Sequence, residues 1–438
     1  MVIRFSAENF RSFKEKQELT LVATSLKELP GALIHIDGFS HDLLRVAAIY
    51  GANASGKTNV LKALSFMCST VRNSHSKWAP EARINRHTFR LNQSESKPSS
   101  FEVEFLVSGT PYRYGFVLNT ERILEEWLLA YPQGKQQLWF TRNEKQKEGQ
   151  EPAGRFSFGR HLSGENRAIE ALTRKNSLFL SAAAQNNHSM LLPVYNWFAA
   201  NAHFAMAPRD SSQSTANMCK DNKRKEILAN MLSSVDLGVT GLRVEEVRLD
   251  EEVESINAEH FKNFFAALKN MVSALDPQAN IETITKLFLL HRGSDEKPVE
   301  FPLEEESAGT SAYFALLGPV ISVLENGGVL CVDELDSSLH PLLALELVKL
   351  FNDEKLNPMG AQLIFNTHDT NLLDNSILRR DQIWFTEKDA QGATHLYPLS
   401  DFTPRKNENL KRGYLQGRFG AVPFIGQIGL EMKRHKSS

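Results

Sequence analysis

The sequence predicts an α/β fold with a mixed β-sheet core, an antiparallel β subdomain and a helical insertion. Three observations support this prediction. Short apolar runs near both ends of the chain stop at polar motifs, a middle stretch contains β-rich runs spaced by about ten residues, and no heptad pattern lasts long enough for a long coiled coil. With 438 residues, 42% hydrophobic and 23% charged, the chain has the composition of a folded globular protein.

The N-terminal lobe is expected over residues 1–100. Alternating apolar residues predict strands near residues 2–5 and 17–24. Leu44–Tyr50 is a compact apolar run, typical of a central parallel strand that is buried on both faces. From Thr58 onward apolar residues recur at helical spacing, so a strand, a glycine-rich loop and a helix follow one another directly.

The sequence pattern in the middle of the chain changes twice, first to short β-rich runs and then to a mainly helical pattern. Residues 101–160 contain short β-rich runs separated by Gly, Pro, Asn or charged residues, which predicts an antiparallel meander. Residues 161–285 are mainly helical in pattern, most clearly in an apolar stripe from Phe261 to Leu275 that we expect to be buried core. Residues 287–291 and 299–301 flank a turn and predict a hairpin.

The C-terminal lobe is expected over residues 286–400, followed by a basic tail at residues 401–438. Two further buried strands are predicted at Gly328–Val332 and Gln362–Asn366, and polar residues follow each of them. In open α/β sheets ligands bind at the carboxyl ends of the strands. We therefore expect the functional residues to lie at this edge.

Composition and charge exclude several classes of protein. Cys68, Cys219 and Cys331 are far apart and form no C-x-x-C pair, which argues against a disulfide framework and against a zinc site. No apolar run approaches the ~20 residues that cross a bilayer, and the first residues do not resemble an export signal. We therefore expect a cytoplasmic protein without a membrane partner.

Net charge also limits the possible ligands. The whole chain carries −2, whereas the tail holds eight Lys and Arg against three acids, so any contact with a polyanion would be local. A solvated basic tail explains this distribution equally well.

The strongest motif runs from Gly51 to Thr58 and matches G-x-x-x-x-G-K-[ST] between the predicted strand and helix. Its glycines allow backbone N–H groups to surround a phosphate, and the helix directs its positive end at the same anion. Lys57 would reach the β- and γ-phosphates, and Thr58 would offer its hydroxyl to Mg²⁺. The predicted nucleotide-binding residues are Gly51, Asn53, Ala54, Ser55, Gly56, Lys57, Thr58 and Asn59.

A pair of carboxylates follows the predicted strand at residues 328–332. Strand alternation would send Asp333 and Glu334 to opposite faces, Asp333 towards the magnesium ion and Glu334 towards the water that attacks the γ-phosphate. Two acids after a strand can also simply cap the next helix. The phosphate-binding loop elsewhere in the chain favours the catalytic interpretation.

Two further motifs complete the predicted site. His368 follows the strand at residues 362–366 and could donate to a γ-phosphate oxygen. The second motif precedes a helical run and again combines hydroxyls, glycine and a helix N-terminus, which suits an anion. One nucleotide does not need two cradles, so we expect this motif to contact ATP bound to another copy; an ordinary N-cap is the alternative. Its residues are Ser307, Ala308, Gly309 and Thr310.

Taken together, these motifs resemble the ABC-type ATPases that are grouped with RecF, Rad50, SMC and OLD proteins. The resemblance is carried by residues 9–13, 51–59, 306–312, 329–341 and 365–369. It implies an ABC-type P-loop NTPase head that uses ATP and Mg²⁺, with ATP joining two copies head to head as a homodimer or within a higher homo-oligomer.

The resemblance also implies roles for single residues, and it limits the subgroup of these ATPases to which the chain can belong. Arg11 would lie near the nucleotide, Asp336 at the dimer seam, and Gln93 would be the glutamine that links the lobes at the metal. Only 70 residues follow His368, too few for the Toprim nuclease domain of OLD proteins. The segment 414–424 instead resembles the stand-alone ATPases of bacterial anti-phage pairs of the Rlo/AbiL and PARIS kind, in which a separate Toprim-like nuclease or other effector supplies the toxic activity.

The sequence therefore predicts an ATP-hydrolysing, dimerising switch or sensor in bacterial phage defence that controls a partner effector. Two alternatives stay open. A RecF-like repair or recombination ATPase would bind duplex DNA, for which residues 223–225 and the basic tail are the sequence support. A non-hydrolysing scaffold would hold ATP as a structural ligand and sense a phage protein.

Overall fold

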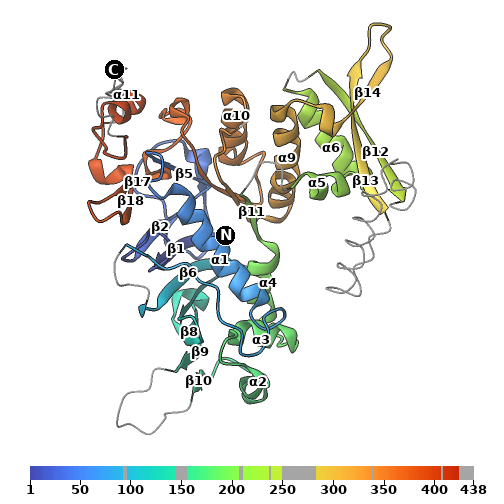
Figure 1. Ribbon diagram of the computed structural model, residues 1–438. Helices are drawn as coiled ribbons and strands as arrows, with labels where there is room; N and C mark the ends of the chain where they lie inside the picture. Colours follow the sequence, from blue (N-terminus) through green and yellow to red (C-terminus); the bar gives the residue numbers. More distant parts are fainter. Residues whose placement is uncertain are drawn as a thin grey trace, which may run out of the picture. The chain divides into compact units, whose positions relative to one another are not determined.

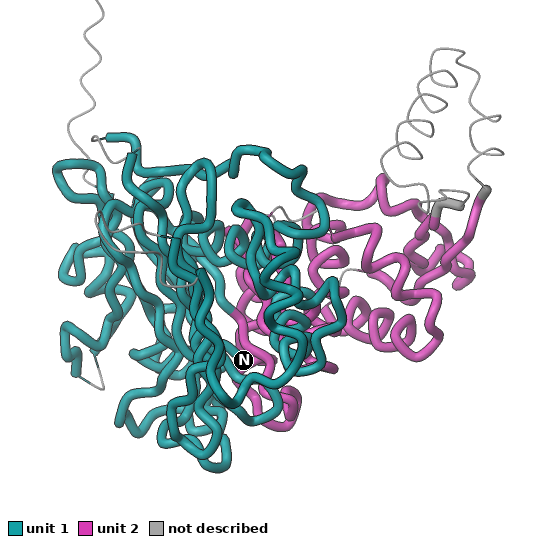
Figure 2. The backbone as a smooth tube through the Cα atoms, turned by 90° about the horizontal axis from the view of Figure 1, so that it is seen from below, with its two compact units in different colours: residues 1–199, 364–438 teal, residues 200–363 magenta. Residues whose placement is uncertain are grey.

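The computed structural model describes residues 1–91, 96–144, 155–206, 211–235, 238–248, 283–337, 339–405 and 408–423. The chain divides into two compact units, unit 1 with residues 1–199 and 364–438, and unit 2 with residues 200–363 (Figure 2). The predicted apolar stripe from Phe261 to Leu275 and the candidate Gln93 lie outside the described residues.

Unit 1 contains a seven-stranded antiparallel sheet in the order β10-β9-β8-β7-β6-β1-β2 (Figure 1). The meander predicted for residues 101–160 is confirmed, and the first two strands of the chain extend it. The strands are β1 (Val2–Glu8), β2 (Gln17–Thr20), β6 (Ser99–Val107), β7 (Thr110–Leu118), β8 (Ile123–Ala130), β9 (Gln137–Asn143) and β10 (Phe156–Phe158).

A second sheet of unit 1 carries the predicted central strand, β5 (Val46–Gly51), all six residues of which are buried. β5 lies between β16 (Gln362–Asn366) and β17 (Ile383–Lys388). β17 runs parallel to β5 and antiparallel to β18 (Thr394–Pro398), so this sheet is mixed, as predicted. Burial on both faces explains why β5 and β16 read as continuous apolar runs. The short strands β3 (Leu33–Ile34) and β4 (Leu43–Leu44) pair with each other.

Helix α1 (Lys57–Asn73) starts directly after the glycine-rich loop and packs on the seven-stranded sheet (Figure 1). The Phe66 ring of α1 lies 5.0 Å from the ring of Phe101 in β6 and 5.5 Å from that of Phe10, measured between centroids. The segment around Phe10 is therefore fixed between α1 and the sheet. The remaining helices of this part are α2 (Asn166–Leu172), α3 (Phe179–Gln185), α4 (Leu192–Ala200) and α11 (Leu410–Leu415).

Unit 2 combines a parallel strand pair with a small antiparallel sheet. β11 (Ala202–Ala205) runs parallel to β15 (Val329–Val332), which is the strand predicted before the two carboxylates. β13 (Thr283–Arg292) and β14 (Pro298–Pro302) form the predicted hairpin, and β12 (Val239–Arg248) adds a third strand. β11 and β12 fall inside the segment predicted to be mainly helical, so that prediction was too uniform. The helices are α5 (Ser212–Met218), α6 (Asn222–Ser233), α9 (Ala308–Asn326) and α10 (Pro341–Asn352).

Helix α9 is the apolar core helix of unit 2. Among the described residues it is the one helix long and apolar enough to cross a bilayer, and 61% of that stretch is buried inside the protein. Pro319 lies within it and cannot donate to the carbonyl of Ala315. The Thr215 hydroxyl of α5 donates to that carbonyl at 3.0 Å, so the neighbouring helix satisfies the group that the proline leaves unbonded.

The three cysteines, Cys68, Cys219 and Cys331, are free and buried. Burial raises the pKa of Cys68 to about 12 and that of Cys219 to about 11. Since the thiolate is the reactive form, both thiols are protonated and unreactive at neutral pH.

Candidate functional site: the phosphate-binding loop and its surroundings

The loop between β5 and α1 has the geometry of an anion cradle. Gly51 has φ +154° and Gly56 has φ +112°, the latter in a region that favours glycine. A Cβ at Gly51 would lie 2.5 Å from the Thr386 carbonyl oxygen, and one at Gly56 would lie 2.3 Å from Thr394 Oγ1. Both motif glycines are therefore required, because any side chain there would collide with the neighbouring strands.

Lys57 lies inside this cradle. Its side chain is buried, and its Nζ donates to the carbonyl oxygens of Gly51 at 3.0 Å and Ala52 at 3.2 Å. The ammonium group and the N-terminus of a 17-residue helix therefore meet at one place, which suits a phosphate group. Thr58 follows in the first turn of α1. These residues fit the triphosphate and Mg²⁺ that the sequence predicts.

Side chains from neighbouring segments, most of them hydroxyl groups, form hydrogen bonds with the loop and with one another, and no sequence motif predicted them. Ser55 Oγ lies 2.6 Å from Thr386 Oγ1 in β17. Thr394 Oγ1 in β18 donates to the Ser55 carbonyl oxygen and is within hydrogen-bond distance of Ser12 Oγ, both at 2.7 Å. Asn59 Nδ2 also donates to Ser12 Oγ at 2.7 Å. Single threonines within strands carry no recognisable pattern, so only the three-dimensional structure shows that they lie at the loop.

Arg11 lies at the edge of a cavity of about 510 Å³ beside the loop. Its φ is +51°, and its backbone N–H donates to the His87 carbonyl oxygen at 2.8 Å. Burial lowers the pKa of Arg11, and burial together with Arg11 and Arg90 lowers the pKa of His87. Among the described residues that line the cavity none is acidic, so it favours an anionic or polar ligand. The polar and charged lining residues are Arg11, Ser12, Asn59, His87, Thr88, Arg90 and Lys388.

His368 is exposed, and its chain neighbours on both sides are fixed to β5. The Thr367 backbone N–H donates to the Ile49 carbonyl oxygen at 3.2 Å, and the Tyr50 hydroxyl donates to the Asp369 carbonyl oxygen at 3.1 Å. Since Ile49 and Tyr50 directly precede the loop, His368 lies at the same edge of unit 1 as the phosphate cradle.

The carboxylate pair follows β15 in unit 2. The Asp333 backbone N–H still donates to the Ala205 carbonyl oxygen at 3.0 Å, whereas Glu334 is exposed and has φ +53°. The strand alternation that we expected for the two side chains therefore does not apply, because the backbone leaves the extended conformation at Glu334. A left-handed conformation costs a residue with a side chain about 1–3 kcal/mol, and such strain is concentrated at functional sites. Asp336 is half-buried in the turn that follows.

The signature-like motif begins α9, also in unit 2. Ser307 is the N-cap, and its Oγ accepts a hydrogen bond from the Thr310 backbone N–H at 3.1 Å. The N-cap alternative is thus realised within the single chain. Ser307 and Ala308 are nevertheless exposed and Gly309 is half-buried, so a ligand can reach the helix N-terminus.

The predicted site residues are divided between the units. Gly51–Asn59, Arg11 and His368 belong to unit 1, whereas Asp333, Glu334, Asp336 and Ser307–Thr310 belong to unit 2. Within each unit, the contacts described above hold the residues of the group in place.

Comparisons with known proteins agree with the loop motif. A family model described as "AAA domain, putative AbiEii toxin, Type IV TA system" matches residues 46–374. No curated protein matches the sequence significantly. Solved structures that match include an Smc head bound to the C-terminal winged-helix domain of ScpA, with 12% identity, coverage of 92% of this chain and 99% of that chain, and a TM-score of 0.42. Another is an Smc head domain with an extended coiled coil bound to the C-terminal domain of ScpA from Pyrococcus furiosus, with 12% identity, coverage of 92% and 97%, and a TM-score of 0.38.

Proposed function

The chain belongs to the AAA-domain family whose model spans residues 46–374, and from this premise we propose that it binds MgATP and hydrolyses it. The observation that carries the proposal is the Lys57 ammonium group held within the Gly51–Gly56 cradle at the N-terminus of α1. This arrangement binds phosphate by charge and by backbone N–H groups together.

Each site residue then has a chemical role. Lys57 and the loop amides bind the β- and γ-phosphates, while Thr58 and Asp333 hold Mg²⁺ directly or through water. Glu334 accepts a proton from, or orients, the attacking water, and His368 donates to the γ-phosphate.

The cavity at Arg11 accommodates the nucleoside end of ATP. It starts at Asn59 and Ser12, which border the loop, and its volume of about 510 Å³ is within the range of nucleotide-sized sites. The Arg11 guanidinium can stack on a base or pair with a phosphate oxygen, since it has a planar face and several donors.

The exposed N-terminus of α9 supports ATP-dependent dimerisation as part of this proposal. As an N-cap, Ser307 Oγ accepts from the Thr310 backbone N–H and lies 2.9 Å from Thr310 Oγ1; when the Thr310 hydroxyl is the donor of that second contact, the Ser307 hydroxyl proton can be given to a phosphate oxygen. A γ-phosphate bound by a second copy would add this contact to the favourable helix dipole. ATP would then stabilise a closed dimer by its differential affinity, and hydrolysis would reopen it.

The biological role that we favour is a switch in bacterial phage defence that holds or releases a separate nuclease or other effector. The family description, which names a toxin–antitoxin system, and the resemblance of segment 414–424 to stand-alone defence ATPases support it. The duplex-DNA alternative is less supported, because Arg224 in the basic cluster at residues 223–225 pairs with Glu325 at 2.8 Å.

Nucleotide binding and phosphate release by purified Lys57→Ala and Glu334→Gln variants test the proposal. Lys57→Ala should weaken MgATP binding, whereas Glu334→Gln should keep binding and lower turnover by about 10²–10⁴-fold, the usual effect of losing a catalytic acid or base. Lys62→Ala, on the same helix but outside the loop, is the matched control. An unaltered rate in Glu334→Gln contradicts its role, and binding without hydrolysis by the wild type favours the scaffold alternative.

A further inference from the structure

The C-terminal clamp, residues 408–423, packs on the edge of the sheet that carries the phosphate-binding loop. The ring of Tyr414 in α11 stacks on that of Phe385 in β17 with a centroid distance of 5.5 Å and an interplanar angle of 12°. Phe419 stacks on the other part of the same cluster, 6.0 Å from Phe385, and its carbonyl oxygen accepts from the Tyr397 hydroxyl at 3.1 Å. These contacts make the clamp an ordered, packed part of unit 1.

Two glycines allow this close packing. A Cβ at Gly413 would lie 2.8 Å from the Phe419 ring, and a Cβ at Gly420 would lie 2.7 Å from both Glu387 Oε2 and the Tyr397 hydroxyl. Gly420 also has φ +65°, which a side chain would strain. Gly413, directly before segment 414–424, and Gly420 within that segment thus allow the clamp to pack closely on the sheet.

The clamp contacts the surroundings of the site at two places, which we call its two arms. The first arm is Tyr414, which reaches the start of the phosphate-binding loop. The Tyr414 ring lies against Tyr50, the last residue before Gly51, with a centroid distance of 5.8 Å. The Tyr414 hydroxyl lies 3.3 Å from the Ala421 carbonyl oxygen, to which it donates. Burial raises the pKa of Tyr414. Tyr414 therefore connects the clamp to Tyr50, the residue that directly precedes the loop.

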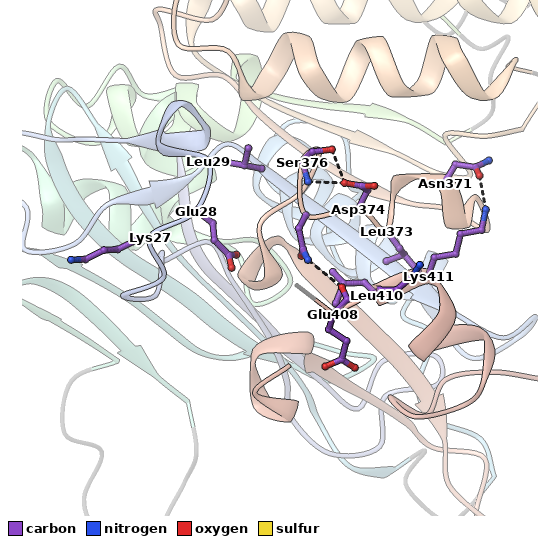
Figure 3. Close-up of a pocket in the computed structure, with 12 residues that line it drawn as sticks. Lys27, Glu28, Leu29, Asn371, Leu373, Asp374, Ser376, Glu408, Leu410 and Lys411 are labelled. Carbon is purple, nitrogen blue, oxygen red and sulfur yellow. Dashed lines mark hydrogen bonds between the residues drawn. The ribbon is translucent and has the colours of Figure 1, made fainter. Parts of the chain in front are cut away.

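A second arm reaches the segment that follows His368. Lys411 Nζ donates to Asn371 Oδ1 at 2.7 Å, and Asn375 Nδ2 donates to the Glu408 carbonyl oxygen at 3.3 Å. Figure 3 shows these residues along a cavity of about 770 Å³. Lys411 and Asn371 are exposed, so substitutions there leave the core intact.

We propose that the C-terminal clamp positions the nucleotide site, with Tyr414 fixing the start of the phosphate-binding loop and Lys411 fixing the segment behind His368. Tyr414 and Lys411 are positioning residues, because they act through Tyr50 and through Asn371 in the segment behind His368, and not on the nucleotide itself. The inference rests on the proposed ATPase function. It predicts that the two arms affect different steps, nucleotide binding for Tyr414 and turnover for Lys411.

The first arm is tested by comparing Tyr414→Phe with Tyr397→Phe. Both changes remove one hydroxyl from the same aromatic cluster and keep the ring, but Tyr397 contacts the clamp and not the loop. We expect Tyr414→Phe to weaken MgADP binding by about three- to ten-fold, the usual effect of one lost hydrogen bond, and Tyr397→Phe to leave it unchanged. Equal affinities in the two variants, with similar falls in thermal stability, would show a merely structural role and overturn this arm.

The second arm is tested by Lys411→Ala beside Arg412→Ala, its neighbour on α11. We expect Lys411→Ala to lower kcat by about two- to five-fold with KM unchanged, as for loss of an exposed charged hydrogen bond. Lys411→Arg should restore the wild-type rate because it keeps a donor, and Arg412→Ala should not change it. A change in KM alone, or the same loss in both alanine variants, would contradict the assignment.

MgADP titration separates this proposal from the proposed function, because it does not depend on hydrolysis. If Lys57→Ala binds MgADP as the wild type does, the nucleotide site itself is wrong and both proposals fall. If Lys57→Ala loses binding while Tyr414→Phe and Lys411→Ala behave as the wild type, the clamp proposal falls and the ATPase proposal stands.

Discussion

At the scale of single residues, the site depends on backbone conformations that most side chains avoid. Gly51, Ala54 and Gly56 shape the loop with positive φ angles, and Glu334 carries its carboxylate on a left-handed residue. At Gly51 and Gly56 the neighbouring Thr386 and Thr394 leave no room for a side chain. Small substitutions at the loop glycines should therefore affect binding more than substitutions of exposed polar residues.

Gly56→Ala should abolish measurable nucleotide binding and lower the free energy of unfolding by about 1–3 kcal/mol, since it adds a clash with Thr394 to an unfavourable φ. Gly109→Ala is the matched control, because Gly109 has φ +77° and open space around it. Titration calorimetry and urea unfolding would measure both effects. Normal binding by Gly56→Ala would contradict the tight cradle.

The stability of the protein should fall as the pH is lowered below about 6.5. Burial lowers the pKa of His75, His87 and His188 in the folded protein, with smaller contributions from Arg174 at His75 and from Arg11 and Arg90 at His87. The unfolded chain titrates at the ordinary value and binds more protons in this window, so stability rises with pH there. Urea unfolding at pH 7.5 and 5.5 would measure the difference, and His75→Gln should reduce it. A pH-independent midpoint would contradict this assignment.

At the scale of elements, burial on both faces made strands predictable and partial exposure did not. β5, β15 and β16 appear in the sequence as apolar runs and were located almost to the residue. β12 was missed because its charged residues alternate with few apolar ones, and it lies in a segment of helical pattern. β17 and β18 were also not predicted. The hydroxyl groups of Thr386 and Thr394, which these strands place beside the loop, were therefore not predicted either. The motif residues of the site were thus predictable, whereas the residues that hold them were not.

Thr215→Val should destabilise the packing of α5 on α9 by about 1–3 kcal/mol, because it leaves the Ala315 carbonyl buried without a donor. A Pro319→Ala background restores an intrahelical donor for that carbonyl, so there the same change should cost less. A double-mutant cycle of urea-unfolding free energies would measure this coupling. Additive effects would show that the hydroxyl does not compensate for the proline.

At the scale of the whole molecule, the proposed chemistry uses residues of both units. Unit 1 holds the residues that we propose bind phosphate, and unit 2 holds the carboxylate pair and the exposed N-terminus of α9. The sequence revealed both sets through their motifs. It could not reveal which residues fold together, because unit 1 is built from two segments that are far apart in the chain.

Ser307→Arg should prevent ATP-dependent dimerisation, since it places a bulky charged side chain at the α9 N-terminus, and sedimentation with a non-hydrolysable ATP analogue would measure it. Asn326→Arg, at the exposed opposite end of α9, is the control. Mixing Ser307→Arg with Lys57→Ala should restore at most one competent site in each mixed dimer. Full activity of either single variant would refute sites shared between two copies.

The interrupted layout of unit 1 affects how the protein is made. Ser55 bonds to Thr386, 331 residues further along the chain, and β5 finds its neighbour β17 only after unit 2 has been translated. During synthesis on the ribosome the apolar β5 therefore stays unpaired while most of the remaining chain is made. An unpaired apolar strand favours aggregation or chaperone binding. ATP capture should accordingly be a late event, so nascent chains released early would lack it.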